Sequence, residues 1–179
     1  MRASRHFTEA MPPVLSLIAA VSSDGYVSRD HGVPWDLPAD REHFRACAAG
    51  KWLLLGRTTY EEMLGWFSDH HPLVLSRDPA FLPAVGQRVA SVAEALALAA
   101  AAGQEELLVC GGAQVYAAAL PLADRLILTR VDQRLGGGLP FPAFEEAEWP
   151  LRVRRRHAAD ALHAQAFEIR IHERVRAGP

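Results

Sequence analysis

The sequence contains few cysteines and no excess of charge of either sign. Its two cysteines, Cys47 and Cys110, lie among apolar residues without metal-ligand spacing, and we expect them to be reduced core thiols of a cytoplasmic protein. The formal net charge of −2 favours neither nucleic acid nor an anionic membrane surface as a partner. The basic stretch 152–156 is interrupted by Val153 and is predicted to be the solvated face of a strand.

Long apolar runs and metal-binding motifs are also missing. No run is long enough to span a bilayer, and residues 1–13 lack the apolar centre of a secretory signal. We expect residues 1–13 to be a disordered extension of a domain that spans 14–175. The eight histidines form no His-Glu-x-x-His motif and no Cys/His cluster with zinc spacing, so we expect no metal site. His70 and His71 are predicted to lie in an exposed loop.

The order of apolar segments predicts a single α/β domain. A chain of 179 residues, half of them hydrophobic, is long enough for one domain with its own core. The apolar run 14–21 is typical of a buried parallel strand. Further strands are predicted at 52–55, 73–75, 107–110, 125–131, 151–157 and 164–173, and helices at 39–49, from Thr58, at 91–102 and at 113–120. Thr58 with Glu61 and Ser91 with Glu94 match capping boxes. We therefore expect a mostly parallel central sheet of about eight strands, with helices on both faces and a C-terminal antiparallel hairpin.

One carboxylate is predicted to lie on the apolar face of a helix. Counting from Asp40, Phe44, Cys47 and Ala48 follow at i+4, i+7 and i+8. A charged group on that face must be paired, meet a polar ligand or take up a proton. The alternative is an ordinary acidic residue in a first helical turn, where the helix dipole favours it.

Two glycine-containing junctions join a predicted strand to a predicted helix. They are Leu55-Gly56-Arg57-Thr58 and Cys110-Gly111-Gly112-Ala113. Free N–H groups at such junctions can bind anions, and two junctions in one sheet could hold the two ends of a dinucleotide. The sequence has no Gly-x-Gly-x-x-Gly, so the standard dinucleotide fingerprint is absent, and an ordinary tight turn remains the alternative at each junction.

The ordered set of motifs resembles the dihydrofolate reductase family over nearly the whole chain past Pro13. It begins with Leu15-Ser16-Leu17-Ile18-Ala19-Ala20 and continues through Trp35-Asp36-Leu37-Pro38-Ala39-Asp40, Gly56-Arg57-Thr58-Thr59-Tyr60-Glu61, Leu75-Ser76, Gly111-Gly112-Ala113-Gln114-Val115-Tyr116, Leu128-Thr129-Arg130-Val131-Asp132 and Phe167-Glu168-Ile169. The resemblance implies transfer of a hydride from NADPH to 7,8-dihydrofolate to give tetrahydrofolate. It implies a small-molecule substrate and a protein that is a monomer or a weak homodimer.

The resemblance also assigns roles to residues. Asp40 would hold the pterin and promote protonation at N5, and Thr129 would hydrogen-bond the carboxylate directly or through water. Trp35 would close the site, and Tyr116 would pack near the nicotinamide. The substrate-binding set implied is Ile18, Ala19, Val33, Asp40, Phe44, Met63, His70, Cys110 and Thr129. The set implied for NADPH is Ala20, Val27, Gly56, Arg57, Thr58, Thr59, Leu75, Ser76, Arg77, Gly111, Gly112, Ala113, Gln114, Val115 and Tyr116. The family's Gly-Gly pair is joined by a cis peptide, and the sequence alone leaves its isomer open here.

Three positions depart from the family pattern. His70 stands where an arginine normally binds the glutamate α-carboxylate of folate, and a mostly neutral imidazole cannot form the same bidentate pair. Arg45 could supply a cation instead. Ala90 replaces a lysine often found near the 2′-phosphate of NADP, which weakens the preference for NADPH over NADH, although Arg77 could compensate. Gly138-Leu139 replaces Asp-Thr, which predicts a looser loop around Gly32.

Two other functions stay open. The first is a reductase of the same fold that acts on another pterin, or on a pyrimidine as in riboflavin synthesis. The segment from Trp35 to Asp40 argues against the pyrimidine reductase, whereas His70 favours a different substrate. The second is a nucleotide-binding module without catalysis, against which the presence of Asp40, Thr129 and Tyr116 together argues.

Overall fold

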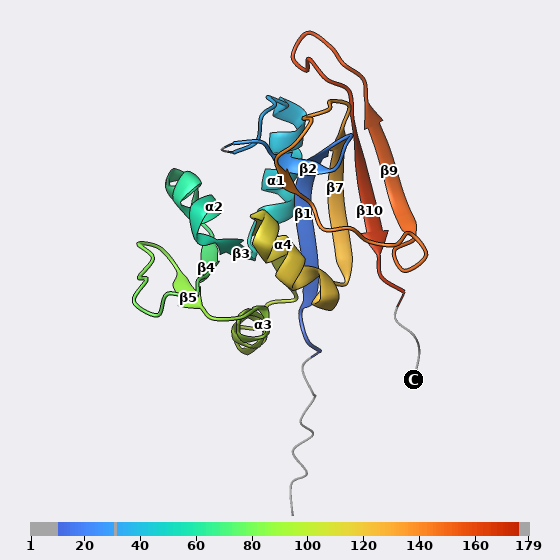
Figure 1. The fold of residues 1–179 in the computed structure, drawn as a ribbon. Helices are drawn as coiled ribbons and strands as arrows, with labels where there is room; N and C mark the ends of the chain where they lie inside the picture. The colour runs from blue at the N-terminus through green and yellow to red at the C-terminus, as the bar shows by residue number, and fades with distance from the viewer. Residues whose placement is uncertain (1–10, 31, 176–179) are drawn as a thin grey trace, which may run out of the picture.

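The protein is built on one twisted eight-stranded sheet, seen in a computed structural model that describes residues 11–30 and 32–175 (Figure 1). The strand order is β5-β4-β3-β6-β1-β7-β10-β9. The first six strands in this order run parallel, and β10 and β9 complete the sheet as an antiparallel hairpin. The bounds are β1 Val14–Ser22, β3 Trp52–Gly56, β4 His71–Leu75, β5 Gln87–Val89, β6 Glu106–Gly111, β7 Arg125–Val131, β9 Leu151–His157 and β10 Phe167–Glu173.

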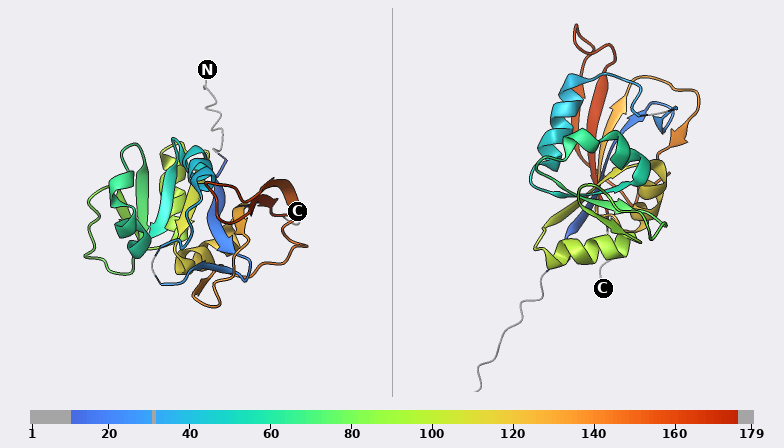
Figure 2. Two further views of the ribbon diagram at one scale, coloured as in Figure 1. Left: turned by 90° about the horizontal axis from the view of Figure 1, so that it is seen from above. Right: turned by 90° about the vertical axis from the view of Figure 1, so that its left-hand side faces the viewer.

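Helices cover both faces of this sheet (Figure 2). They are α1 Pro38–Ala48, α2 Arg57–Glu62, α3 Val92–Ala101 and α4 Ala113–Ala119, with short 3-10 helices η1 Leu64–Trp66 and η2 Leu120–Leu122. We call the two sides of the sheet the α1 face and the α4 face. Ile18 and Ile127 pack with α1 and α2 on the α1 face. Leu17 and Leu128 pack with α3 and α4 on the α4 face, because side chains alternate along each strand.

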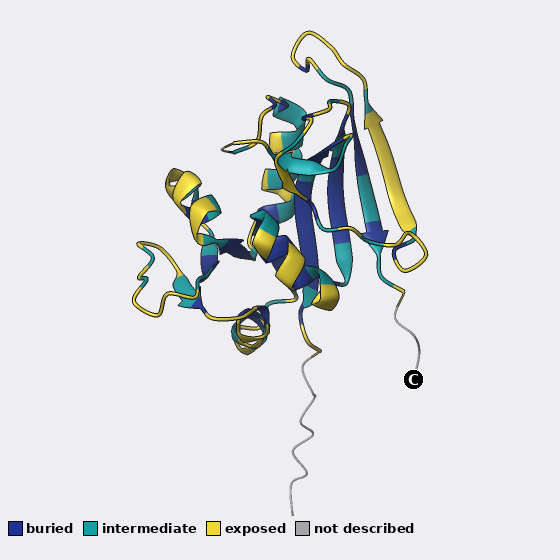
Figure 3. Cartoon of the chain, in the orientation of Figure 1, coloured by how far each residue is buried: buried dark blue, intermediate teal, exposed yellow. Residues whose placement is uncertain are grey.

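Burial follows this layering (Figure 3). The central strands are almost wholly buried, as apolar runs in parallel strands between helical layers must be. Strand β9 is exposed along most of its length, as expected for the solvated basic stretch at a sheet edge. No helix within 11–30 and 32–175 is long and apolar enough to cross a membrane.

The predicted fold class is confirmed, and most element bounds agree within two residues. The pattern missed three short strands, β2 (Tyr26–Ser28), β5 and β8 (Leu139–Pro140), because each offers too few residues for a periodic signal. The last strand starts at Phe167 rather than at 164. Residues 1–10 of the expected N-terminal extension lie outside the described residues.

Two local predictions were wrong. Helix α2 begins at Arg57 without a side-chain cap, and Glu61 pairs with Arg57 at 2.8 Å instead of completing a capping box with Thr58. His70 and His71 do not form an exposed loop. His71 begins β4 and stacks on Trp52 with ring centroids 4.0 Å apart. At Ser91 the hydroxyl accepts the Glu94 N–H at 3.0 Å, as in a capping box, but the Glu94 carboxylate accepts the N–H of Ala90 at 2.6 Å instead of that of Ser91.

The loop after β7 is joined to the loop after β1 by a short strand pairing and by the side chain of Asp24. Strand β2 pairs with β8 in a separate two-stranded ribbon. Both carboxylate oxygens of Asp24 accept N–H bonds across the gap, from Leu135 at 3.0 Å and from Gly136 at 2.8 Å. These bonds, the Leu135 bond foremost, lower the pKa of Asp24 to about 2. An ionised Asp24 therefore ties the two loops together near the carboxyl end of β1.

Candidate active site

Asp40 and Thr129 form the polar centre of the α1 face. Helix α1 opens with Pro38, which suits a first helical position, and this places Asp40 in the first turn. The Thr129 hydroxyl, buried in β7, donates a hydrogen bond of 2.6 Å to Asp40 Oδ1. The family resemblance implied a hydrogen bond between Thr129 and the carboxylate, either direct or through water, and the bond here is direct. Phe44, Cys47 and Ala48 of the same helix pack into the apolar cluster on the α1 face, as the helical spacing predicts.

The surroundings of Asp40 favour its protonated form. Burial raises the pKa of Asp40, while the Thr129 hydrogen bond and the charge of His43 work in the opposite direction. Burial likewise lowers the pKa of His43, which the Asp40 carboxylate partly restores. His43 was not singled out from the sequence, although its position at i+3 from Asp40 puts the two side chains on neighbouring ridges of the helix. Asp40 is thus a half-buried carboxyl group whose proton affinity lies above that of a solvated one.

A row of aromatic side chains extends from Asp40 along the α1 face. Phe44 lies against Trp66, with ring centroids 5.2 Å apart, and Trp66 stacks on His70 at 4.3 Å. Met63 packs in the same cluster. Trp66 carries no signal in the sequence that would place it here, because it follows the α2 motif in a 3-10 turn without helical periodicity. His70 is half-buried and turned onto an indole ring, and its Nδ1 has no hydrogen-bond partner among the described residues.

The structure separates the other predicted substrate-binding residues. Ile18 and Cys110 lie in or against the apolar cluster on the α1 face, together with the aromatic row. Ala19 lies in the cluster on the α4 face, so its side chain points away from Asp40 and only its backbone could meet a ligand there. Val33 is 57% exposed. Trp35 is buried with Leu37 and Ile169 in a separate apolar cluster.

Tyr116 and the Gly111–Gly112 pair lie where β6 meets α4. The peptide between the two glycines is cis, as in the family. The Tyr116 hydroxyl is buried and donates a 2.6 Å hydrogen bond to the carbonyl oxygen of Ile18. Burial raises the pKa of Tyr116 well above its usual value, so the side chain acts as a neutral hydrogen-bond donor. This hydrogen bond joins α4 to strand β1, which also carries Ile18 and Ala19 of the predicted substrate-binding set.

The predicted cofactor residues gather at the carboxyl ends of adjacent strands. Gly56 at the end of β3 pairs in register with Leu75 at the end of β4, so Arg57 and Ser76 follow side by side. On the other flank Leu55 pairs with Gly111. The set therefore forms one edge: Gly56, Arg57, Thr58 and Thr59 after β3, Leu75, Ser76 and Arg77 after β4, and Gly111 through Tyr116 after β6. Ala20 lies in β1 and Val27 in β2.

The two junctions approach each other closely at Gly56, where an added side chain would be tight against Val115. A Cβ on Gly56 would lie 3.1 Å from Val115 Cγ2 and 3.7 Å from the Gly112 nitrogen. Arg57 is exposed beside them, ion-paired with Glu61 and placed over the Phe81 ring at 4.7 Å. An open, glycine-lined edge with an arginine at its border suits the phosphates of a dinucleotide. The residues present therefore fit NADPH.

The described residues bring three potential metal ligands together elsewhere, in the β9–β10 loop. Ligand atoms of His157, Asp160 and His163 lie within 4.8 Å of one another. His163, however, already uses both ring nitrogens. Nδ1 lies 2.8 Å from Asp160 Oδ1, and Nε2 accepts the Ala39 N–H at 3.1 Å. The Nε2 lone pair of His163 therefore accepts a hydrogen bond from the first turn of α1, next to Asp40, and is not available to a metal ion.

The architecture and the site together define a class of protein. A parallel α/β sheet with two glycine-containing strand–helix junctions at one edge, next to an apolar cluster bordered by one half-buried carboxyl group, is the arrangement expected of a nucleotide-dependent oxidoreductase that acts on a small heterocycle.

Comparisons with known proteins give the particular family. The dihydrofolate reductase family model matches residues 14–174. The chain is 39% identical over 156 residues to dihydrofolate reductase type 3 of Salmonella typhimurium, covering 87% of this chain and 95% of that protein. It is 35% identical over 136 residues to dihydrofolate reductase of Neisseria meningitidis, covering 75% of this chain and 83% of that protein.

A solved structure agrees with these sequence matches. Dihydrofolate reductase from Enterococcus faecalis, complexed with NADP(H) and RAB-propyl, superposes with a TM-score of 0.82 at 25% identity, over 90% of this chain and 96% of that chain. The chain belongs to the dihydrofolate reductase family. It is an NADPH-dependent oxidoreductase that reduces dihydrofolate.

Proposed function

We propose that Asp40 is the carboxyl group that binds the pterin and promotes its protonation during reduction of 7,8-dihydrofolate to tetrahydrofolate. The observation that supports this role is its position: half-buried, bonded to Thr129, and bordered by the apolar row that starts at Phe44. Its raised pKa suits a group that acts near a proton transfer. The ionised form can accept hydrogen bonds from the amino group and ring N–H of a pterin.

The neighbouring residues have supporting roles in this proposal. Thr129 fixes the orientation of the carboxylate, and Trp35 excludes water from one end of the pocket. Phe44 and Ile18 hold the two faces of the heterocycle, and Met63 borders the aryl group. NADPH, when bound, supplies the hydride. Tyr116 and the two glycines before α4 shape the surface against which the nicotinamide lies, and Arg57, Ser76 and Arg77 bind the 2′-phosphate.

We also propose that the carboxylate of the folate tail is bound weakly. His70 is the residue that occupies the position of the family arginine, and its stack on Trp66 keeps its ring within the aromatic row. A half-buried imidazole against an indole presents no fixed positive charge to a carboxylate. Recognition then depends on the pterin and the aryl ring more than on the glutamate.

The test compares two substrates and one variant. NADPH oxidation by the purified protein is measured with dihydrofolate and with a dihydropterin that lacks the glutamate tail. We expect turnover of both, with Michaelis constants within about tenfold, since a full charge-assisted clamp is worth about 1.5–3 kcal/mol. Asp40→Asn is expected to abolish most turnover at neutral pH while leaving NADPH affinity unchanged. Full activity of Asp40→Asn would refute the role of Asp40. A Michaelis constant for dihydrofolate far below that for the tail-less dihydropterin would refute weak binding of the folate tail.

We further propose that the protein works as a monomer or weak homodimer in the cytoplasm. One chain supplies Asp40, Thr129 and the residues that follow β3, β4 and β6, which supports a site that does not depend on a second copy. The two free thiols, Cys47 and Cys110, fit a reducing compartment. Light scattering of the purified protein measures its mass directly.

A further inference from the structure

Four arginines gather on the α4 face of the last three strands. In register, Arg130 of β7 lies opposite Glu168 of β10, and Glu168 lies opposite Arg156 of β9. The next row on this face contains Leu128, Arg170 and Arg154. Because Leu128 belongs to the core on the α4 face, all these side chains point away from Asp40. We call Arg130, Arg154, Arg156 and Arg170 the arginine cluster.

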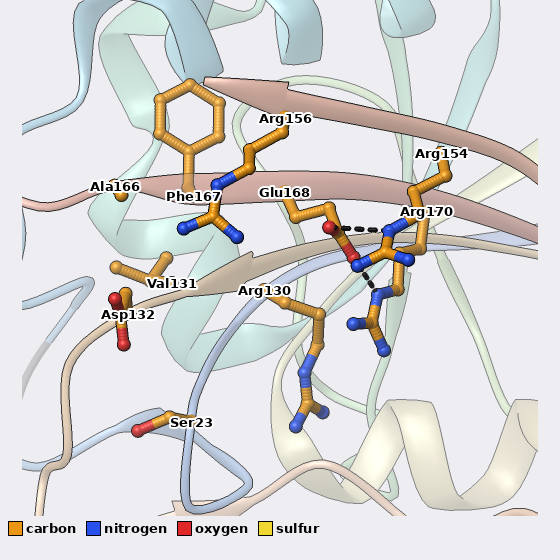
Figure 4. A pocket seen from close by; sticks show the side chains of 10 residues that line it. All are labelled: Ser23, Arg130, Val131, Asp132, Arg154, Arg156, Ala166, Phe167, Glu168 and Arg170. Atoms are coloured by element: carbon orange, nitrogen blue, oxygen red, sulfur yellow. Dashed lines mark hydrogen bonds and ion pairs between the residues drawn. The ribbon is translucent and has the colours of Figure 1, made fainter. Parts of the chain in front are cut away.

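The carboxylate of Glu168 pairs with only two of the four arginines of the cluster. Arg154 Nε donates to Glu168 Oε2 at 2.7 Å, and Arg170 Nε donates to Oε1 (Figure 4). These two hydrogen bonds, first from Arg154 and then from Arg170, lower the pKa of Glu168. Neither Arg130 nor Arg156 has an ion pair among the described residues. Both oxygens of Glu168 are thus used while half of the cluster has no anionic partner.

The unpaired charges border a cavity. It has a volume of ≈260 Å³ and is lined by the arginine cluster with Ser23, Val131, Asp132, Ala166, Phe167 and Glu168. Four positive and two negative side chains give this lining an excess of positive charge. Burial lowers the pKa of Arg130, and the nearby Arg170 lowers it further. A half-buried cation beside like charges is costly until an anion compensates it.

We propose that this cavity binds a small phosphate-type anion with at least two negative charges. Guanidinium groups bind phosphate oxygens through paired N–H donors, and several arginines at one site favour a compact polyanion over a single carboxylate. The volume lies below the range of about 300–1,000 Å³ typical of drug-sized ligands, so a free phosphate, a pyrophosphate or the phosphate end of a small ester is the matching class. Bound there, the anion joins β7, β10 and β9 and stabilises the C-terminal hairpin.

This site is distinct from the cofactor edge and the folate pocket. Arg57 and Ser76 follow β3 and β4, which are separated from β7 by β6 and β1 in the sheet. Thr129, next to Arg130 in β7, points to the opposite face and bonds Asp40. An anion in the arginine cluster therefore binds without displacing substrate or NADPH.

The experiment measures pyrophosphate binding by titration calorimetry, with saturating NADPH present to occupy the cofactor edge. Arg130→Gln and Arg156→Gln each remove one unpaired charge. Arg155→Gln is the matched control, because Arg155 alternates with Arg154 and Arg156 along β9 and lies on the other face. We expect a dissociation constant at least about tenfold weaker in the two cluster variants and nearly unchanged in Arg155→Gln.

Thermal unfolding gives an independent readout. Pyrophosphate is expected to raise the melting temperature above that in sodium chloride of equal ionic strength, and Arg130→Gln is expected to lose this rise. Without the anion, Arg130→Gln should melt no lower than the wild type, since the substitution removes a repulsive charge. An equal rise in Arg130→Gln, or no rise in the wild type, would overturn the proposal. A rise with citrate but not with pyrophosphate would overturn the assignment to phosphate.

Discussion

Thr129 Oγ1 and Asp40 Oδ1 lie 2.6 Å apart, although 89 residues separate them in the sequence. Thr129 belongs to a central strand and Asp40 to the first turn of α1, so this bond holds the start of the helix against the sheet. A hydrogen bond to the charged form of a carboxyl group favours that form. The bond therefore sets both the position of Asp40 and its proton affinity.

Thr129→Val is expected to raise the pKa of Asp40 further, because it removes the hydrogen bond that opposes the effect of burial. The acidic limb of the pH–rate profile for NADPH oxidation should then move to higher pH. Loss of a hydrogen bond to a charged group also lowers the free energy of unfolding by about 1.5–3 kcal/mol. Thr129→Ser retains the hydroxyl and is the control. Identical pH profiles for the valine and serine variants would contradict the expectation.

Asp40→Asn is expected to stabilise the protein at neutral pH. The pKa of Asp40 is raised in the folded protein above its ordinary value of 3.8, so ionisation of this group disfavours the native state. Below pH 3.8 the side chain is neutral in both the folded and unfolded states, and the wild type keeps its full stability from this group. That stability is lost as the pH rises through the folded-state pKa.

The measurement is denaturant unfolding of wild type and Asp40→Asn at several pH values. The variant's advantage should be largest near pH 7 and disappear toward pH 3.8. Asp36→Asn is the control for charge, since Asp36 is exposed and only pairs with Arg41 at the surface. An advantage that grows toward acid pH would show that the pKa of Asp40 is lowered, not raised.

The sequence predicted the sheet and the polar centre of the site because both depend on regular patterns. Apolar runs give the parallel strands, and the spacing from Asp40 to Phe44 and Cys47 gives the buried face of α1. The contact between Asp40 and Thr129 could be predicted only from the resemblance, because no local pattern relates residues so distant in the sequence. Ala19 shows the limit of the resemblance. The resemblance assigned this residue to the substrate-binding set, but it did not indicate that the side chain points to the α4 face, away from Asp40.

The parts that were missed depend on tertiary packing. Trp66 joins the apolar cluster on the α1 face through a 3-10 turn, and His70, in the loop before β4, stacks on Trp66 rather than being exposed. Glu61 pairs with Arg57 because both lie on one exposed side of a short helix, which removes it from the expected capping box. The short strand β5 forms because it pairs with β4 in the folded protein. A three-residue segment gives no indication in the sequence of the strand with which it will pair.

Arg57→Gln is expected to weaken binding of NADPH by about tenfold or more, since a charge-assisted bond to a phosphate is worth about 1.5–3 kcal/mol. Binding of NADH, which lacks the 2′-phosphate, should change little. The ratio of the two dissociation constants, measured by fluorescence titration, isolates the phosphate contact. Arg41→Gln, an exposed arginine of α1, is the control. An equal loss of affinity for both cofactors would assign Arg57 a structural role instead.

His163→Ala is expected to destabilise the first turn of α1. The Nε2 atom of this buried residue accepts the Ala39 N–H at 3.1 Å, while the helix has no side-chain cap of its own at Leu37. Loss of a helix cap costs about 0.5–2 kcal/mol, which denaturant unfolding can resolve. Leu162→Ala alters the same loop at a side chain that is 72% exposed and should cost little. Equal unfolding free energies for the two variants would exclude a capping role.

Gly138→Ala is expected to destabilise the protein more than Gly136→Ala. Both glycines have a positive φ, of +130° and +71°, so both substitutions force an alanine into a conformation that it rarely adopts. Only at Gly138 would the added Cβ collide with main-chain atoms, lying 2.1 Å from the carbonyl oxygen of Ser28 and 2.9 Å from the Cα of Arg29.

This contact explains why the chain departs from the Asp-Thr pattern of the family at Gly138-Leu139. Main-chain atoms of β2 cannot move without disturbing its pairing with β8, so overpacking should cost about 1–3 kcal/mol beyond the loss in Gly136→Ala. Gly138→Asp, which restores the family residue, should therefore lower the melting temperature. Gly138→Asp with unchanged stability would show that the two loops can separate, as the prediction of a looser loop around Gly32 requires.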